Sequence, residues 1–281
     1  MDIVYIIKNI VLGIVEGLTE FLPVSSTGHL IIASDLMSIE TDAFNKMFMV
    51  VVQLAAILAV LVLYWPRIWK VLVSFFRGEK EGRRFMLIWV LGCIPAVVMA
   101  LLFEDLIDQY LFTVPTVIAA LVVGAVLMIL GEKKLAARNT QDEVKNISVK
   151  QSLIVGAAQC VSLWPGFSRS AATIMGGWAA GLTTAAAADY SFFLAIPIMF
   201  GATGYSLLKY FMGDSAGASF TSTQLTALVL GCVVSFIVAL FVVKGFLTFL
   251  KKKPLRYFAW YRLGLAAILL LLLVTGVIQG V

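Results

Sequence analysis

Residues 16–29 read EGLTEFLPVSSTGH, and residues 165–173 read PGFSRSAAT. These two polar segments lie in a chain of 281 residues, of which 61% are hydrophobic and only 13% are charged. A charged side chain at the centre of a bilayer costs about 2.5 to 3.5 kcal/mol on insertion scales, so Glu16, Glu20 and Arg169 together oppose insertion by roughly 8 to 10 kcal/mol unless they find partners. We interpret residues retained at that cost as functional.

The composition is that of an all-α polytopic membrane protein rather than of a soluble domain. A membrane-spanning helix needs about 20 apolar residues to cross a hydrocarbon core about 30 Å thick. The three cysteines are scattered singly and predict neither a disulfide nor a metal site. Six stretches are long and apolar enough to span, at roughly 44–65, 84–104, 114–131, 187–210, 224–247 and 257–279.

Two further apolar regions, about 1–33 and 150–184, contain the polar segments and are interrupted by proline. Pro23 breaks the first region, and Pro165 with Gly166 breaks the second. Proline ends a helix and frees backbone groups that lipid cannot satisfy. We therefore expect two re-entrant helical hairpins, whose tips are covered by protein.

The basic residues predict the orientation of the chain. Seventeen of the 21 Lys and Arg residues fall in or beside three expected loops, the segments 67–84, 133–150 and 244–262. The positive-inside tendency places these segments in the cytoplasm. The segments 33–43, 104–113 and 211–223 contain no basic residue and are expected outside. Tyr261 flanks the third basic segment and reads as an aromatic anchor at the membrane interface.

Counting crossings places the first hairpin on the outer side and the second on the cytoplasmic side, each followed by three spanning helices. This pattern predicts an inverted-topology repeat, about 1–132 against 150–279, within a single integral-membrane domain that spans residues 1–281. The two hairpins would meet near the middle of the membrane. A faint echo in sequence agrees, because GIVE at 13–16 and GAAQ at 156–159 each precede a proline at a similar distance.

The acidic pair indicates a shared proton or a bound cation. Glu16 and Glu20 are four residues apart, so on a helix they share one face with Cβ atoms about 5 to 6 Å apart. Two carboxylates this close either hold a proton between them or bind a cation, and hard oxygen ligands suit Mg²⁺ or Ca²⁺. The alternative is a purely structural pair held by salt bridges.

Hydroxyl residues follow both prolines, where they are expected to start helices and to bind an anion. A hydroxyl at a helix start accepts a hydrogen bond from a free N–H group. Such a start beside an arginine is an anion site, and Arg169 can bind phosphate through two parallel hydrogen bonds. The alternative is that these serines bond only to the backbone. The residues expected around the anion are Ser25, Thr27, Gly166, Ser168 and Ser170.

His29 lies one helical turn after Ser26, close enough to exchange a proton with its hydroxyl. Acids, a hydroxyl nucleophile, an imidazole and an arginine are the groups that phosphoryl transfer requires. Whether Ser26, His29 or water attacks stays open, and a lone histidine is often only structural. A transporter or flippase for a phosphorylated polyprenyl lipid is the rival interpretation, because inverted repeats with broken helices also build secondary transporters.

In these segments the chain resembles the bacterial undecaprenyl-diphosphate phosphatases of the bacitracin-resistance type. The family pattern of an acidic residue or Gln, three residues and Glu is present at 16–20, followed by FLPVSSTGH. The pattern PGxSRSxxT is intact at 165–173. The resemblance implies a multi-pass enzyme of the bacterial cytoplasmic membrane. Its expected reaction removes one phosphate from undecaprenyl pyrophosphate and so recycles the lipid carrier of peptidoglycan synthesis.

The resemblance also implies roles for individual residues. Ser26 would be the nucleophile, His29 with Glu16 and Glu20 the proton-transfer or metal groups, and Arg169 with Ser168 and Thr173 the pyrophosphate clamp. A divalent cation and an outward-facing site are expected. The expected partners are the polyprenyl pyrophosphate and membrane lipids, without nucleic acid, and a homodimer is left open.

Overall fold

The structure is a computed structural model of the whole chain, and it describes residues 2–40, 42–136, 139–212, 220–250 and 253–278. Parts of the basic segments at 137–138 and 251–252, and of the outer segment at 213–219, lie outside these ranges. All long elements of the described ranges are helices. In chain order they are α1 (Ile3–Thr19), α2 (Ser26–Leu36), α3 (Ala43–Phe76), α4 (Lys80–Tyr110), α5 (Val114–Lys134), α6 (Val149–Gln159), α7 (Arg169–Ala179), α8 (Thr184–Met212), α9 (Ser222–Leu250) and α10 (Arg256–Val274), with short 3₁₀ turns at Val144–Asn146 and Cys160–Leu163.

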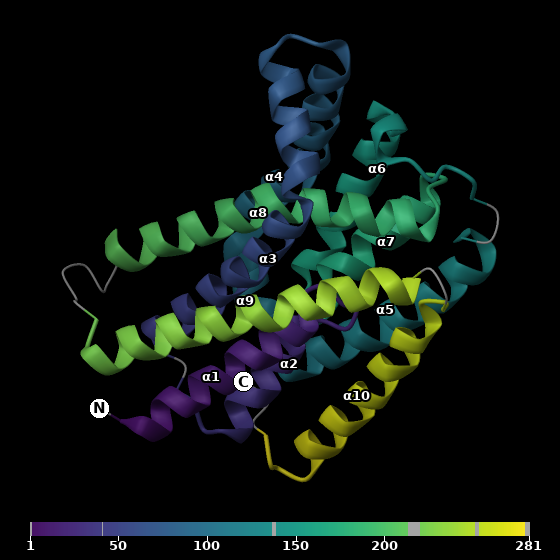
Figure 1. Cartoon of the computed structure of the whole chain (residues 1–281). Helices are drawn as coiled ribbons and strands as arrows, with labels where there is room; N and C mark the ends of the chain where they lie inside the picture. Colours follow the sequence, from purple (N-terminus) through teal and green to yellow (C-terminus); the bar gives the residue numbers. More distant parts are fainter. Residues whose placement is uncertain (1, 41, 137–138, 213–219, 251–252, 279–281) are drawn as a thin grey trace.

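The six predicted spans are confirmed as the six described helices that are long and apolar enough to cross a membrane, namely α3, α4, α5, α8, α9 and α10. The segment 67–84 was expected to be a loop, but most of it is helical. Helix α3 continues to Phe76 and α4 begins at Lys80, so only a tight turn with Gly78 at φ 76° separates them. At 34 residues, α3 is about 51 Å long, which exceeds a hydrocarbon core of about 30 Å. The projecting pair stands at the top of Figure 1.

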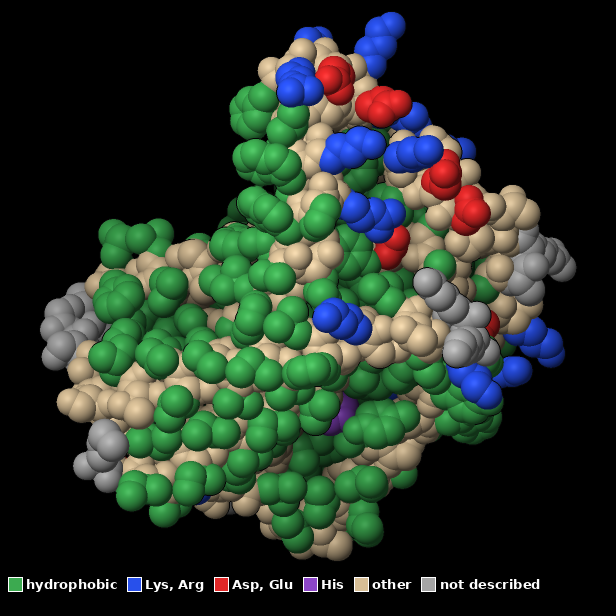
Figure 2. All heavy atoms as spheres, in the orientation of Figure 1, with side chains coloured by type: hydrophobic (Ala, Val, Ile, Leu, Met, Phe, Trp, Pro, Cys, Tyr) green, Lys and Arg blue, Asp and Glu red, His purple; other side chains and the backbone are tan. Residues whose placement is uncertain are grey.

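The surface separates charge from apolar side chains. On the face shown in Figure 2, Lys and Arg gather over the α3–α4 turn and along the same end of the molecule, and hydrophobic side chains cover most of the rest. Many large apolar side chains of the spanning helices are exposed, for example Leu102 at 70% and Phe241 at 72%. Such a surface requires lipid around it, so the chain is a multi-pass membrane protein.

In each interrupted segment the helix is broken at the proline, as predicted from the sequence. Residues 20–25 separate α1 from α2, and residues 164–168 separate the 3₁₀ turn after α6 from α7. Serines cap both second helices, and both adopt left-handed backbone conformations, with φ 72° at Ser25 and φ 78° at Ser168. The two breaks therefore share one unusual backbone geometry.

The first helix of each interrupted segment packs closely on a spanning helix. A Cβ atom at Gly13 of α1 would collide with the carbonyl oxygen of Gly231 in α9. A Cβ atom at Gly156 of α6 would collide in the same way with the carbonyl oxygen of Gly92 in α4. Backbones approach this closely only where side chains are absent, as at small-residue interfaces between membrane helices.

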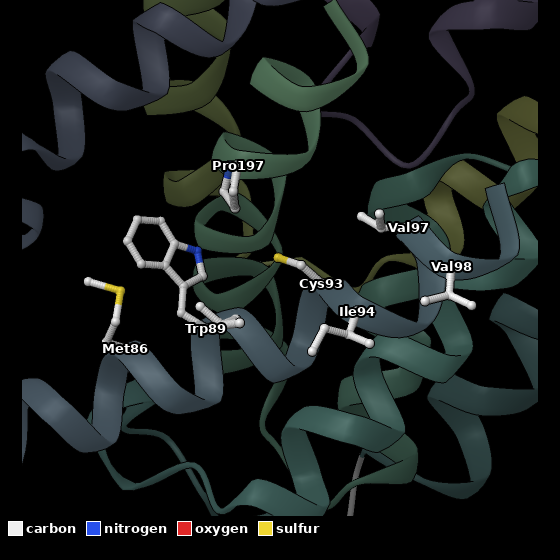
Figure 3. Close-up of a pocket in the computed structure, with 8 residues that line it drawn as sticks. Met86, Trp89, Cys93, Ile94, Val97, Val98 and Pro197 are labelled. Carbon is white, nitrogen blue, oxygen red and sulfur yellow. The ribbon is translucent and has the colours of Figure 1, made fainter. Parts of the chain in front are cut away.

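Helix α8 contains Pro197, which has no N–H group to donate to the carbonyl of Phe193. Trp89 of α4 supplies the missing donor, because its Nε1 lies 2.6 Å from that oxygen. Figure 3 shows Trp89, Cys93 and Pro197 around an apolar cavity of about 350 Å³. No acidic residue, histidine, lysine or arginine is among the residues that line it, so this cavity offers no site for phosphate chemistry.

Candidate active site

The two polar segments, about 150 residues apart in sequence, meet in the structure. Arg169 Nη2, at the start of α7, lies 3.0 Å from Glu20 Oε1, at the end of α1. The two side chains are only 10% and 4% exposed. The Ser170 hydroxyl donates to the Leu22 carbonyl at 3.0 Å, which joins the two breaks a second time. Glu20 of the first segment and Arg169 and Ser170 of the second therefore meet in one largely buried cluster.

Glu20 joins the arginine to a hydroxyl. Its second oxygen, Oε2, accepts a hydrogen bond of 2.6 Å from Ser26 Oγ at the start of α2. Both residues are buried. A carboxylate at this distance can take the hydroxyl proton, while the arginine fixes its orientation. Glu20 is thus the group positioned to activate Ser26.

Glu16 lies one turn earlier on α1 and is fully buried. It lies close enough to Glu20 for a hydrogen bond between the two carboxyl groups, which needs a proton shared between them, and it interacts electrostatically with Arg169. No N–H or hydroxyl donor of another described residue reaches its oxygens. Arg169 Nε is also buried and unpartnered there, while Nη1 donates to the Ser191 carbonyl at 3.2 Å. Buried polar groups are normally satisfied, so these atoms are the ones available to a bound cation or phosphate.

In the part of the chain that the structure describes, no three His, Cys, Asp or Glu residues lie close enough together to bind one metal ion. Glu20 already has two protein partners. The carboxylate oxygens of Glu16 are hard donors of the kind that Mg²⁺ and Ca²⁺ prefer, although a proton shared with Glu20 would occupy one of them. The donors present therefore fit a cation that keeps most of its ligands from substrate or water.

The predicted helix starts are confirmed for two serines. Ser25 Oγ accepts from the Gly28 amide at 3.2 Å, and Ser168 Oγ accepts from the Ala171 amide at 3.3 Å. Thr173 is fully buried, and its hydroxyl bonds to the Ser191 hydroxyl at 2.6 Å, inside the protein. Thr27 is half-buried at the start of α2. Gly166, at φ 95°, could not carry a side chain, because a Cβ atom there would lie 2.7 Å from the Val117 carbonyl oxygen.

His29 does not bond to Ser26, which differs from the expectation of direct proton exchange. Its Nδ1 lies 2.7 Å from the Ser25 carbonyl, and its Nε2 lies 2.7 Å from the hydroxyl of Tyr261 in α10. A carbonyl can only accept, so Nδ1 carries the proton and Nε2 of the neutral ring accepts from the tyrosine. Sequence reasoning missed Tyr261 as a site residue, because its position beside a basic segment suggested an interface anchor.

The prediction for Arg262 is also wrong. The basic-residue pattern places Arg262 in a cytoplasmic segment, but in the structure it is completely buried among helices α5 and α10 and the two breaks. Its guanidinium donates to carbonyl groups of both polar segments. A basic residue near the end of a span cannot be assigned to a loop from sequence, since an arginine can equally turn inward and satisfy backbone carbonyls.

Comparison with known proteins gives one consistent family. A sequence model described as "Bacitracin resistance protein BacA" matches residues 9–268. A protein of Clostridium tetani (strain Massachusetts / E88), named undecaprenyl-diphosphatase, is 47% identical over 97% of this chain and 98% of its own length. Proteins of the same name from Clostridium novyi (strain NT), 46% identical over 98% of both chains, and from Ruminiclostridium cellulolyticum, 45% identical over 96% of both, match as fully. This chain therefore belongs to the family of the bacitracin resistance protein BacA.

Proposed function

We propose that this chain hydrolyses undecaprenyl diphosphate to undecaprenyl phosphate and phosphate, the activity that the names of its relatives describe. The observation that carries the proposal is the continuous chain from Ser26 Oγ through both oxygens of Glu20 to Arg169. A transporter of the same lipid would need the arginine, but it would not need a carboxylate 2.6 Å from a serine hydroxyl.

In the proposed reaction, Ser26 Oγ attacks the terminal phosphorus and Glu20 takes the serine proton. The bond from that phosphorus to the bridging oxygen breaks, and the lipid monophosphate leaves with the electron pair. Water then attacks the phosphorus of the phosphoserine, and the bond from phosphorus to Ser26 Oγ breaks. The serine oxygen takes back the proton held by Glu20, and the water proton leaves on the released phosphate. Arg169, through its unpartnered Nε, donates to the phosphoryl oxygens on which negative charge develops.

A divalent cation, Mg²⁺ or Ca²⁺, would be held at Glu16, next to Glu20. When bound, it would neutralise charge on the pyrophosphate oxygens. The fully buried carboxyl group of Glu16, which no N–H or hydroxyl donor of the described residues reaches, supports this assignment. A proton shared between Glu16 and Glu20 is the alternative. Ser25, Gly166, Ser168 and Ser170 would shape the turns around the substrate phosphates.

The two interrupted segments would be re-entrant hairpins, related by an inverted repeat of about 1–132 and 150–279 within one domain. Two paired features support this symmetry. The left-handed capping serines Ser25 and Ser168 stand at equivalent breaks. The glycine contacts pair α1 of the first half with α9 of the second, and α6 of the second half with α4 of the first. The chain would lie in the bacterial cytoplasmic membrane with its site open to the outer side, and a homodimer is compatible with this arrangement.

The test is phosphate release by the purified protein in detergent, without a membrane gradient. Wild-type protein should release phosphate from undecaprenyl diphosphate, and Ser26→Ala should abolish the release. Ser152→Ala is the matched control, because Ser152 is also buried and its hydroxyl bonds to the Ile88 carbonyl and the Tyr190 hydroxyl, neither of which belongs to the site. Binding of the lipid without turnover by the wild-type protein would contradict the proposal and support a carrier.

A further inference from the structure

Arg262 stands at the junction of the two breaks. Its guanidinium has five N–H groups, and the structure gives five contacts, all of them to backbone carbonyl oxygens. The side chain is 0% exposed, and no ion pair to a carboxylate joins it within the described ranges. A buried cation without an acidic partner is expensive, so its five carbonyl contacts are what retain it.

These contacts reach both halves of the candidate site. Nη1 donates to Pro23 in the first break at 3.4 Å and to Phe167 in the second at 2.8 Å. Nη2 donates to Gly166 at 3.2 Å. Pro23 comes three residues before Ser26, and Phe167 comes two residues before Arg169. One side chain therefore holds the turn that leads to the attacking hydroxyl and the turn that leads to the phosphate-binding arginine.

The remaining contacts fix the guanidinium to α5. Nε donates to Leu121 at 3.3 Å and Nη2 to Ala120 at 3.0 Å. The approach is possible because residue 124 is glycine, and a Cβ atom there would collide with Nη2. The Phe167 ring covers the guanidinium, with its centroid 5.7 Å from Cζ. Helix α5 thus serves as a rigid support against which Arg262 locates both turns.

We propose that Arg262 is a positioning residue for phosphoryl transfer, which sets the spacing between Ser26 and Arg169 by binding the carbonyl groups of both breaks. This inference rests on the function proposed above. An in-line attack tolerates little displacement, and a shift of about 1 Å in a reacting group can cost about 100-fold in rate. Lysine cannot replace the residue, because an ammonium group has three donors and no planar fork.

Two variants test the proposal. In Arg262→Lys the fork is lost, and in Gly124→Ala the arginine remains but the added methyl group displaces it. Matched controls are Arg256→Lys, an exposed arginine on the same helix, and Gly264→Ala, a helical glycine with open space at its Cβ position. Both test variants should lower kcat by about 100-fold with KM near the wild-type value, because geometry rather than substrate binding is lost. The controls should behave as wild type.

Hydrogen–deuterium exchange gives a readout that does not depend on activity. In both test variants, uptake should rise in residues 20–26 and in residues 164–169 together, while uptake in α9 stays unchanged. Wild-type uptake in both segments of a folded Arg262→Lys protein would overturn the proposal. Uptake that rises throughout the helices would also overturn it, because the residue would then only stabilise the fold. If wild-type protein releases no phosphate, the proposed function fails, while the exchange data still decide whether Arg262 holds the turns.

Discussion

Glu20 accepts from Ser26 through one oxygen and from Arg169 through the other, and in the proposed reaction it is the base that takes the serine proton. Glu20→Gln keeps the size of the side chain and can still accept from one partner, but it cannot take a proton. We expect kcat to fall by about 10²- to 10⁴-fold, the usual contribution of a general base, with little loss of folded protein. Phosphate release by purified variants measures this, with the exposed Glu79→Gln as control. A Glu20→Gln protein with near wild-type kcat would exclude Glu20 as the base.

Arg169 is buried at the same cluster and has an unpartnered Nε. Arg169→Ala should cost about 3 kcal/mol of transition-state stabilisation, or roughly 100-fold in kcat/KM. Arg169→Lys should also be impaired, because a point charge cannot reproduce the fork. Arg67→Lys is the control. Arg67 is exposed and forms a salt bridge with Asp189, and lysine keeps a positive charge there. Full activity in Arg169→Ala would remove the arginine from phosphate binding.

Tyr261 and His29 should act as one unit, because the tyrosine hydroxyl is bonded to His29 Nε2. Tyr261→Phe keeps the ring and removes only this hydrogen bond. If the bond is what orients the imidazole, the loss of kcat in the double variant Tyr261→Phe/His29→Ala should equal the loss in His29→Ala alone. The four proteins form a double-mutant cycle measured by phosphate release. Strictly additive losses would mean that the two residues act independently.

At the scale of elements, the packing of α1 on α9 depends on Gly13. A methyl group at this position would collide with the Gly231 carbonyl, so Gly13→Ala must push the helices apart. Overpacking of this kind typically costs about 1 to 3 kcal/mol, which should lower the melting temperature in detergent. Gly201→Ala in α8 has open space at its Cβ position and should leave it unchanged or raise it. Equal melting temperatures for both variants would contradict the close contact.

The breaks of the helices could be predicted from sequence, whereas the partners across them could not. Pro23 and Pro165 stop helices through local backbone chemistry, and each break appears where its proline stands. The spacing of Glu16 and Glu20 placed two acids on one face. The bond from Ser26 to Glu20, however, crosses the break at Pro23, where helical periodicity no longer relates the residues. Its geometry depends on the turn itself.

At the scale of the whole molecule, the orientation can be tested by labelling single cysteines in intact cells with a membrane-impermeant maleimide. After replacement of Cys93, Cys160 and Cys232, a cysteine at Glu79 should react only after the membrane is opened, because the α3–α4 turn is predicted to be cytoplasmic. Ser222→Cys, at the start of α9, should react without opening. Both positions are exposed. The reverse pattern would invert the proposed topology.

The number of spans can be predicted from sequence, because the bilayer sets the length and apolar character of each spanning segment separately. The same holds for the basic residues, which gather in the segments between spans. Helix α10 shows what this reasoning lacks. Its existence as a spanning helix was predicted, but Tyr261 and Arg262 reach His29 and both breaks only because α10 packs along α5. Contacts between distant segments follow from tertiary packing, so neither residue carried a local signal that separated it from an interfacial or cytoplasmic one.

The projecting ends of α3 and α4 offer a handle for electron microscopy. A helical chain of 281 residues inside a detergent micelle presents few features by which single particles can be aligned. Helix α3 is continuous to Phe76 and α4 is continuous from Lys80, and Gly82 lets the two backbones touch beside the turn. A compact four-helix bundle grafted between Phe76 and Lys80 in helical register would extend this pair as a rigid fiducial. Because the bundle would lie outside the micelle, its orientation could be used to align the particles and so to determine the orientation of the buried site.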